Sequence, residues 1–373
     1  MFTSAFLREF LIGVGTATGI AAVLAIVMAI ADATIGNYGK VKVSINHGAR
    51  ELTVDGGRPL LSTLMGEGIF IPSACGGKGS CGLCKLRVTD GAGEYSTVEQ
   101  PWITETERGQ QMRLSCQVKV KRDMRILVPE ELFSIREYKT EVVSIRDLTY
   151  DIKEVTLALK DPPEMEFRPG RYVQFVVPAY ELTPEPVYRA FSVSSPPSSR
   201  NTIELEIRLV PNGICTTYVF SHLKIGDAVT INGPYGDFSL RDSDRDIVFV
   251  AGGSGMAPIK SMLLDMAEKR IARKTTYFFG ARAVRDLFLV EEMRTLEKRL
   301  PNFTFVPALS SPLPEDKWDG ETGLITEVLA RHYERMDNHE AYLCGSPGMI
   351  DAAIKVFKAK GLPDELTFFD KFS

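Results

Sequence analysis

Three cysteines lie within ten residues in the glycine-rich stretch CGGKGSCGLC, which spans residues 75–84. Five residues separate the first two, two separate the second from the third, and a fourth cysteine follows in RLSC after 31 intervening residues. Thiolates are the soft ligands that iron–sulfur clusters require, and four of them hold a 2Fe-2S centre. The first gap is one residue longer than in the plant-type spacing, but the combination of a cysteine loop and one distant cysteine is kept. The sequence therefore predicts a 2Fe-2S cluster with the ligands Cys75, Cys81, Cys84 and Cys116.

A structural zinc site is the alternative for these cysteines, because paired Cys-x-x-Cys units also bind zinc. Here a single cysteine precedes the one Cys-x-x-Cys unit and a single cysteine follows it. The loop also contains Gly76, Gly77, Gly79 and Gly82, which let the backbone turn tightly so that its N–H groups can point at sulfur. Spacing and glycines together favour the cluster over zinc.

The 373 residues are enough for two or three domains, each with its own core. The net charge is −4 and 25% of the residues are charged, so no basic surface points to nucleic acid. Six cysteines in a chain of this length are not typical of a disulfide framework, and the four cluster cysteines leave only Cys215 and Cys344. A reducing compartment is the simplest interpretation.

The chain has no charged residue from Phe10 to Ala31, a run that matches the roughly 20 residues a helix needs to cross a bilayer. A cleaved signal peptide is the alternative, because Ala29-Ile30-Ala31 has the small-x-small form of a cleavage site. The apolar run is longer than that of a typical signal, and export would place cysteine-ligated iron in the wrong compartment. The sequence therefore predicts a retained anchor with a single membrane span.

The charges beside the span orient it only weakly, since Arg8 precedes it and Lys40 and Lys42 follow it. The cofactor chemistry instead favours the cytoplasm for the C-terminal bulk of the chain. Gly15 and Gly19 form a GxxxG pattern that could pack a partner helix, although small residues are common in membrane spans anyway.

The segment around the cysteine loop is typical of a small sheet with one helix. Residues 40–54 alternate as two strands around the turn Asn46-His47-Gly48, and residues 59–65 suggest a short helix. Further strands are expected at residues 85–89 and 123–128. His47 is expected in a solvated turn, without a catalytic role.

Short β-rich segments separated by turn residues follow Glu131, and this spacing predicts an antiparallel barrel. The expected strands cover residues 138–145, 154–159, 172–177, 190–193, 203–210 and 228–231.

Two motifs in this region indicate a flavin site. Arg189 on an expected strand can hold a pyrophosphate, while Phe191 and Ser192 would face a flat ring and its polar edge. The stretch from Gly213 through Thr216 and Thr217 precedes a helical segment, where backbone N–H groups and hydroxyls suit a phosphate. Arg-x-Phe-Ser alone is more often a surface strand, and Cys215 is best interpreted as a small buried thiol.

From Asp246 the chain alternates strands and helices, which predicts a parallel, doubly wound sheet. The stretch AGGSGMAP lacks the GxGxxG fingerprint of dinucleotide-binding folds. It could bind phosphate in the same way, because glycines after a strand let a phosphate approach a helix N-terminus. The residues expected at this dinucleotide site are Gly252, Gly253, Gly255, Pro258 and Gly345.

The second strand-to-helix turn contains a cysteine. Cys344 is expected to face the same crevice as Gly253, or to be a packed thiol at a strand end, and the spacing does not decide between them. The terminal stretch FFDKFS also has two possible roles, because its aromatic residues could stack on a ring system or fill the core.

These motifs together resemble a known family. The whole chain is similar to the F subunit of the sodium-translocating NADH:quinone oxidoreductase. PSACGGKGSCGLC, RLSCQVKVKRDM and VPEELF are close to the sequence motifs of the family, including the five residues between the first two cysteines. RAFS resembles its flavin motif RxYS, with Phe191 in place of tyrosine, while GGSGMAP, FFGAR, PEDKWDGETG and CGSP resemble its nicotinamide half.

The resemblance implies four parts in order along the chain. They are a transmembrane anchor in residues 1–36, a β-grasp 2Fe-2S ferredoxin domain in residues 37–132, an antiparallel β-barrel FAD domain in residues 133–242 and an α/β doubly wound NADH domain in residues 243–373. Catalytic roles would fall on Ser192, Cys344 and Phe372, with Phe372 shielding the flavin ring.

The implied activity is that of a membrane-anchored NADH dehydrogenase, which passes electrons from NADH to FAD, to the 2Fe-2S cluster and on to integral-membrane partner subunits and, indirectly, quinone. A bacterial inner membrane location with cytoplasmic catalytic domains is expected. Any sodium movement would belong to other subunits, because one span without an internal carboxylate makes no ion path. The preference for NADH over NADPH is implied by the resemblance alone, because Arg282 and Arg285 could suit the 2′-phosphate of NADPH.

The chain departs from the family between Val177 and Tyr188, where it has about ten residues in place of a much longer insertion. The FFDKFS ending also leans toward monooxygenase reductases with the same three modules. Two alternatives therefore stay open: the reductase component of an oxygenase, and a non-enzymatic electron-relay or assembly subunit.

Overall fold

A computed structural model describes residues 4–35 and 38–372, which divide into two compact units. The first unit comprises Met1–Glu67 and Cys84–Glu130, and the second comprises Gly68–Leu83 and Glu131–Ser373. The division thus passes through the cysteine loop, and the domain boundaries expected from the sequence stay predictions. Asn37, in the expected linker after the apolar helix, lies outside the described residues.

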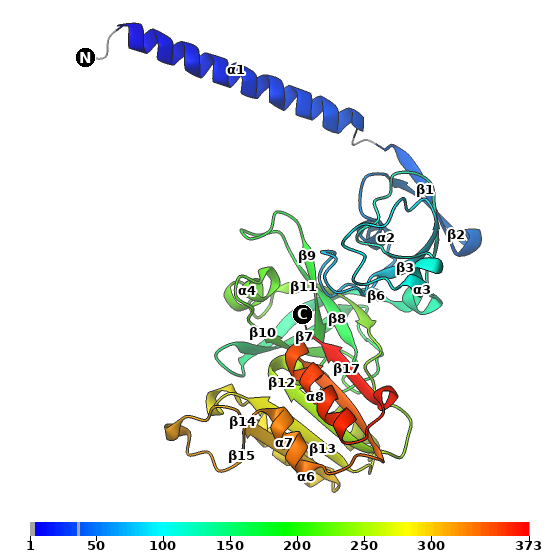
Figure 1. The fold of residues 1–373 in the computed structure, drawn as a ribbon, viewed down its shortest axis with the longest axis vertical. Helices are drawn as coiled ribbons and strands as arrows, with labels where there is room; N and C mark the ends of the chain where they lie inside the picture. Colours follow the sequence, from blue (N-terminus) through cyan, green and yellow to red (C-terminus); the bar gives the residue numbers. More distant parts are fainter. Residues whose placement is uncertain (1–3, 36–37, 373) are drawn as a thin grey trace. The chain divides into compact units, whose positions relative to one another are not determined.

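The apolar run forms one continuous helix, α1 (Ser4–Ile35), as expected (Figure 1). Its stretch Arg8–Met28 has a mean hydropathy of 2.3 and is long and apolar enough to cross a membrane. Among the described helices no other meets this criterion of length and composition.

The remainder of the first unit is a five-stranded sheet with the order β2-β1-β5-β3-β4. The first and last of these strands along the chain, β1 and β5, are neighbours inside the sheet. They pair in parallel, with Val43 opposite Met124. Leu60 and Leu64 of the short helix are fully buried, as expected for an amphipathic helix covered by a sheet. The elements are β1 (Lys40–Ile45), β2 (Arg50–Asp55), α2 (Leu60–Gly66), β3 (Lys85–Asp90), α3 (Glu105–Gly109), β4 (Met112–Leu114) and β5 (Met124–Leu127).

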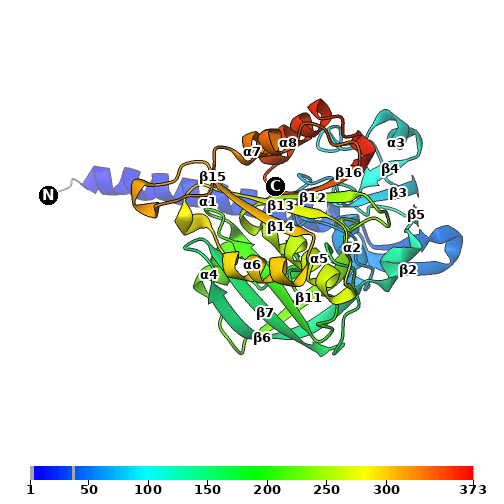
Figure 2. The ribbon, with the colours of Figure 1, turned by 90° about the horizontal axis from the view of Figure 1, so that it is seen from below.

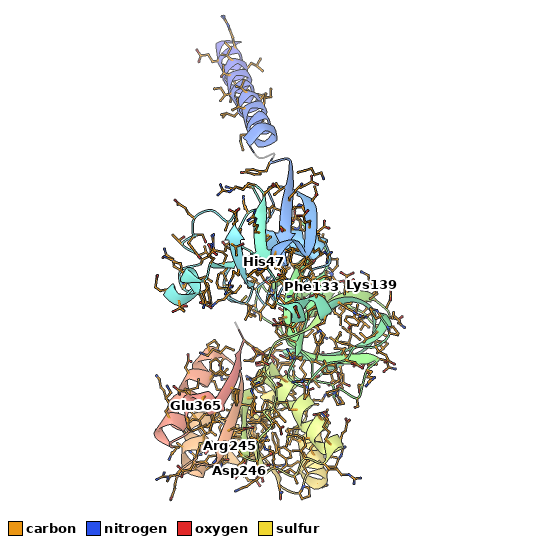
Figure 3. All side chains as sticks on the ribbon, turned by 90° about the vertical axis from the view of Figure 1, so that its right-hand side faces the viewer. His47, Phe133, Lys139, Arg245, Asp246 and Glu365 are labelled. Carbon is orange, nitrogen blue, oxygen red and sulfur yellow. The ribbon has the colours of Figure 1, made fainter. Side chains whose placement is uncertain are left out.

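The sheet and its helix confirm the expected ferredoxin-type fold, and two elements that were not expected complete it. Helix α3 begins at a capping box, in which Thr104 Oγ1 accepts from the amide of Glu107 and Glu107 Oε2 accepts from the amide of Thr104. Strand β4 extends the edge beside β3. His47 lies exposed in the turn between β1 and β2, as expected (Figure 3).

The second unit begins, after the cysteine-loop segment, with a curled antiparallel sheet of order β10-β7-β6-β11-β8-β9 (Figure 1). Its two edge strands approach each other, because Val193 bridges to Leu205 and Ser194 N donates to Glu204 O. The inward side chains form one core that includes Val142, Phe175 and Leu205. The elements are β6 (Arg136–Asp147), β7 (Ile152–Asp161), β8 (Tyr172–Val177), β9 (Val187–Ser192), β10 (Thr202–Arg208), α4 (Ile214–Ser221) and β11 (Ala228–Tyr235).

The C-terminal part is a parallel sheet with the order β15-β14-β13-β12-β16-β17. Helices α5 and α6 cover one face and α7 and α8 the other, and each face has its own core (Figure 2). The doubly wound expectation is therefore confirmed. The elements are β12 (Asp246–Gly252), α5 (Met256–Lys269), β13 (Thr275–Ala281), α6 (Val290–Arg299), β14 (Phe303–Leu309), β15 (Glu321–Thr322), α7 (Ile325–His332), β16 (His339–Gly345), α8 (Pro347–Ala359) and β17 (Thr367–Lys371).

The C-terminal stretch is a strand, which was not expected from the sequence. β17 pairs in parallel with β16, so that Cys344 stands opposite Asp370 and Gly345 opposite Lys371. Phe372 N then donates to Gly345 O over 2.9 Å, and its partly buried ring packs against the α5 core. Phe372 therefore lies at the carboxyl end of the sheet.

Candidate functional site

Each compact unit contains two of the four cysteines expected to hold the cluster. In the second unit the Sγ atoms of Cys75 and Cys81 lie 3.4 Å apart. In the first unit the thiol of Cys84 is hydrogen-bonded with Cys116. Within either unit no three His, Cys, Asp or Glu side chains gather as metal ligands among the residues that the structure describes. Only two residues of chain join the pairs, between Cys81 and Cys84.

The local backbone of the cysteine loop suits sulfur ligation. Its four glycines all have positive φ, between 64° and 85°, which side-chain-bearing residues rarely adopt. The backbone amides of Gly79 and Ser80 reach the sulfur of Cys75, and that of Leu83 reaches Cys81. Hydrogen bonding between the thiols lowers the pKa of Cys75 and raises that of Cys81. Amides that donate to the ligating sulfur atoms support an iron–sulfur cluster, so the loop backbone fits one.

A buried ion pair supports the backbone just before Cys116. Arg113 Nη2 and Nε each lie within 2.9 Å of the Glu99 carboxylate, and both side chains are almost fully buried. Glu99 Oε1 also accepts from the amide of Leu114 over 3.1 Å. Burial raises the pKa of Glu99, but the hydrogen bonds from Arg113 and the backbone outweigh it and leave that pKa below the usual value. This pair was not predicted from the sequence, because neither residue belongs to a motif.

The flavin-motif residues lie on β9 and around the start of α4. Burial raises the pKa of the Cys215 thiol to about 12, and the nearby Arg189 guanidinium acts in the opposite direction. Helix α4 has Gly213 at its N-cap, with no side chain capping its first amides. Thr216 Oγ1 accepts from Val210 N over 3.1 Å, and Thr217 N donates to Gly213 O, so both residues shape the turn. A guanidinium beside uncapped amides fits a pyrophosphate.

The three motif residues of β9 do not share one face. Arg189 and Phe191 point to the same side of the strand, and Phe191 meets Phe175 edge-on at 6.1 Å. Ser192 is buried on the other side, at the end of the strand and opposite Tyr172.

The expected dinucleotide residues form a tight turn at the carboxyl ends of β12 and β16. A Cβ on Gly255 would stand 2.3 Å from Cys344 O, and a Cβ on Gly345 would stand 3.3 Å from Gly252 O. The thiol of Cys344 is fully buried, and burial raises its pKa well above the usual value. Pro258 is the third residue of α5 and is buried. The thiol of Cys344 is thus packed at the strand end, and the backbone of Cys344 lies against the glycine loop. A role for Cys344 in the crevice stays a prediction.

Replacing Gly255 by alanine is expected to weaken NADH binding strongly while leaving the bound flavin in place. The added methyl would overlap the Cys344 carbonyl, which is backbone and cannot rotate away, so α5 or β16 must move. Overpacking of this kind costs about 1–3 kcal/mol of fold stability. The affinity for NADH is expected to fall by up to about 150-fold, the value reached if the whole strain is expressed in the binding turn. The KM for NADH and the FAD content of purified protein measure the two effects. Gly348→Ala is the control, because a Cβ there meets nothing within 4 Å; equal KM values for both variants would contradict the expectation.

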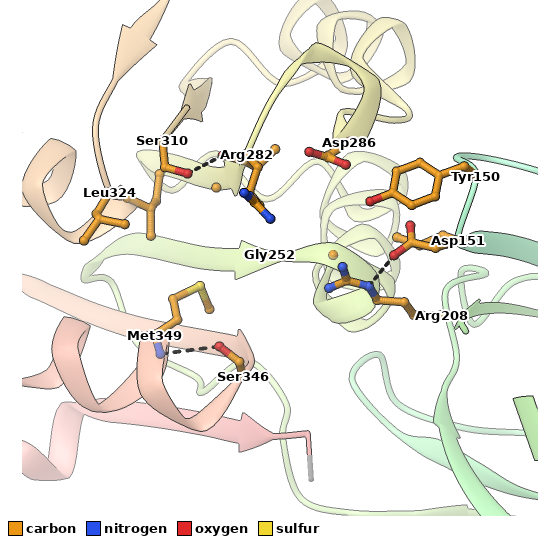
Figure 4. A pocket seen from close by; sticks show the side chains of 15 residues that line it. Tyr150, Asp151, Arg208, Gly252, Arg282, Asp286, Ser310, Leu324, Ser346 and Met349 are labelled. Atoms are coloured by element: carbon orange, nitrogen blue, oxygen red, sulfur yellow. Dashed lines mark hydrogen bonds and ion pairs between the residues drawn. The ribbon is translucent and has the colours of Figure 1, made fainter. Parts of the chain in front are cut away.

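A cleft of about 400 Å³ opens beside this turn, at the carboxyl ends of the parallel strands (Figure 4). Arg208 from β10 reaches it, paired with Asp151 at 2.8 Å and lying 3.1 Å from where a Cβ on Gly253 would stand. Arg282 approaches from the end of β13. Ligands of open α/β sheets bind at this edge, so the cleft suits a dinucleotide. Arg208 was not among the predicted site residues, since its contact with the glycine loop joins residues about 45 positions apart.

Comparison with protein families assigns a cofactor to each region. The 2Fe-2S iron-sulfur cluster binding domain matches residues 43–121, the oxidoreductase FAD-binding domain residues 139–240, and the oxidoreductase NAD-binding domain residues 249–355. The chain therefore carries the modules for a 2Fe-2S cluster, FAD and NAD, and the zinc alternative loses its support.

Curated relatives match over nearly the whole chain. The F subunit of the Na(+)-translocating NADH-quinone reductase of Neisseria meningitidis serogroup B is 38% identical, covering 98% of this chain and 99% of the relative. The protein of the same name in Actinobacillus succinogenes is 37% identical with the same coverage.

Solved structures share the fold. The cytochrome reductase GcoB of Amycolatopsis has a TM-score of 0.71 and 26% identity, covering 89% of this chain and 98% of that one. The ferredoxin reductase in carbazole 1,9a-dioxygenase has a TM-score of 0.69 and 24% identity, covering 90% of this chain and 99% of that one.

Proposed function

The chain belongs to the family of the F subunit of the Na(+)-translocating NADH-quinone reductase, and on this basis we propose that it is the electron-input component of such a complex. It is an oxidoreductase whose three modules form a relay from NADH to FAD to the 2Fe-2S cluster. The observation that carries the proposal is the near-full-length match at 35–38% identity, which spans the apolar helix as well as all three modules.

The order of the relay follows from electron counts. FAD accepts two electrons as a hydride and releases them singly, whereas a 2Fe-2S cluster carries one. On this proposal Arg189 and the first amides of α4 hold the FAD pyrophosphate, and Phe191 and Ser192 border its ring. Cys75, Cys81, Cys84 and Cys116 are the proposed cluster ligands, with the turned amides of the loop supporting the first two.

The proposed NADH site is the cleft at the carboxyl ends of β12, β13 and β16. Gly252, Gly253, Gly255 and Gly345 let a pyrophosphate approach the start of α5, and Arg208 and Arg282 supply positive charge there. Cys344 and Phe372 are proposed to border the nicotinamide, because both lie where β16 ends. NADH is proposed over NADPH from the family.

Membership in this family makes the chain a membrane-associated protein with membrane subunits as partners. We propose that α1 is its single span and that the redox modules lie in the cytoplasm of a bacterial cell, anchored at the inner membrane. The 21-residue apolar stretch supports a span, and the cysteine-ligated iron supports a reducing compartment.

A second candidate is the reductase component of an oxygenase system, favoured by the match to GcoB over 89% of the chain. Purification of the chain with its native partners separates the two: integral-membrane subunits support the quinone reductase, and a soluble oxygenase supports the alternative.

Anaerobic titration of the purified protein with NADH tests the electron order. The flavin absorbance is expected to bleach first, and an EPR signal of a reduced 2Fe-2S cluster is expected to follow. A parallel titration with NADPH is expected to need higher concentrations. Failure of NADH to bleach the flavin would overturn the proposal and revive the non-enzymatic relay.

A further inference from the structure

Helix α5 connects the proposed NADH turn to the flavin barrel through two consecutive side chains. Ser261 Oγ donates to Ser195 O over 2.7 Å, and Ser195 follows β9 by three residues. Lys260 Nζ donates to Glu154 Oε2 on β7 and to Glu204 Oε2 on β10, each over 3.1 Å. We call Lys260, Ser261, Glu154, Glu204 and their neighbour Glu206 the α5 seam.

The centre of the α5 seam is dry and crowded with carboxylates. Lys260 is 2% exposed and Glu154 is 8% exposed, so these charges are held without bulk water. Glu206 stands directly opposite Glu154 in the β7–β10 ladder, is 3% exposed, and neither of its oxygens has a hydrogen-bond partner among the described residues. Glu292 of α6 adds a further carboxylate, 3.8 Å from Lys260 Nζ, while Arg146 neutralises Glu154 from outside. One ammonium thus holds together side chains of α5, α6 and two barrel strands.

We propose that Lys260 is a positioning residue for hydride transfer, which sets the distance between the dinucleotide turn and the flavin strand through the α5 seam. This inference rests on the proposed function. Gly255 of the NADH turn is the N-cap of α5, and Lys260 follows it by five residues. The neighbouring Ser261 is hydrogen-bonded to Ser195, which lies three residues after Ser192. The seam is therefore a short mechanical link between the proposed donor and acceptor sites. A misplacement of about 1 Å at reacting atoms can cost about 100-fold in rate.

Glu206 makes the seam sensitive to pH. Burial raises its pKa to about 8; the charge of Lys260 lowers it, and the charges of Glu154, Glu292 and Glu204 raise it further. The other ionisable groups facing it are Tyr277 of β13 and Cys344 of β16, whose burial keeps both neutral. Because the raised pKa belongs to the folded seam, protonated Glu206 stabilises the packing of α5 on β7 and β10. This contribution is fully present below the ordinary pKa of 4.5 and is lost as the pH rises through about 8. A difference of one proton changes the equilibrium between the closed and the locally opened seam by up to about tenfold per pH unit in this window.

The first test is the variant Lys260→Met, which keeps the length of the side chain and removes its charge. Anaerobic stopped-flow reduction of the flavin by NADH is expected to slow by about 10- to 100-fold. A larger isotope effect with deuterated NADH and an unchanged FAD content are also expected. The control is Lys269→Met on the same helix, because Lys269 is 61% exposed and, among the described residues, forms its ion pair with Asp265 one turn away. Flavin reduction at the wild-type rate in folded Lys260→Met would overturn the inference.

The second test does not depend on turnover and keeps the inference testable if Lys260→Met does not fold. Hydrogen exchange of α5 amides in the FAD-free protein, corrected for intrinsic rates, is expected to rise as pH increases from 6 to 8. In Glu206→Gln this pH dependence is expected to disappear, because the titrating group is gone. A pH dependence identical to wild type would contradict the role of the seam. Wild-type flavin that NADH bleaches shows that the proposed function holds even where the seam inference fails.

Discussion

Replacing Cys116 by alanine is expected to abolish the 2Fe-2S cluster while NADH still reduces the flavin. Four thiolates hold the two iron atoms, and three cannot complete both coordination spheres. Cys116 is buried and hydrogen-bonded with Cys84. A solvent-exposed side chain therefore does not easily take its place as an iron ligand. Iron and acid-labile sulfide are expected to fall to near zero, and the EPR signal of the reduced cluster is expected to vanish. Electron flow from NADH to a one-electron acceptor that reacts with flavin is expected to continue.

Cys215→Ala is the matched control for iron content, because Cys215 is also a buried thiol but is not among the proposed ligands. Its iron and sulfide are expected to equal those of the wild type. A full complement of iron in Cys116→Ala would remove this residue from the ligand set. Zinc in the wild-type protein would refute the cluster itself.

Replacing Arg189 by alanine is expected to strip the flavin and thereby abolish NADH oxidation. The charge of the Arg189 guanidinium acts on Cys215 in the uncapped first turn of α4, and the two together form the positive site proposed for the FAD pyrophosphate. Truncating one member of such a charge pair costs about 2–5 kcal/mol, which weakens binding by about 30- to 5,000-fold. The FAD content after purification and the flavin absorbance on adding FAD back measure the loss. NADH oxidation is expected to return partly at high added FAD, since the NADH cleft is intact.

The control for this variant is Arg200→Ala, because Arg200 belongs to the same barrel but is 57% exposed and pairs with Glu166 on the surface. An exposed pair contributes about 0–1 kcal/mol, so FAD content and stability are expected to stay near wild type. Retained flavin and normal turnover in Arg189→Ala would refute the assignment of this arginine.

The fold was largely predictable because hydrophobic periodicity and turn residues are local signals. The strand expected at residues 172–177 is β8 without a change in its bounds, and the helix after AGGSGMAP is α5. Elements held by partners distant in the chain were missed. Strand β4 has three residues and exists because it pairs with β3, and β17 exists because it pairs with β16. The capping box of α3 was a readable local signal that was overlooked.

The candidate site divides in the same way. Cys75, Cys81, Cys84, Cys116, Arg189 and the glycines after β12 could be proposed from the sequence, because ligand chemistry and tight turns need particular residue types at short spacings. Lys260, Glu206 and Arg208 could not, since a lysine on a helix and a glutamate on a strand are usually solvated. Lys260 and Glu206 are exceptional because both are buried beside Glu154, which precedes them by about 50 to 100 positions in the chain. Arg208 stays half exposed, and only the fold brings it to the glycine loop.

The amino-acid sequence by itself determined which cofactors this protein can hold, because sulfur ligands, phosphate turns and an apolar span are written in residue type and spacing. Tertiary structure alone decided what lies between those sites. The burial of Lys260 among carboxylates, and the strand that carries Phe372 to the end of β16, arise from packing between distant segments. The free energies of these contacts depend on the removal of water from both partners at once. No single stretch of the sequence contains that information.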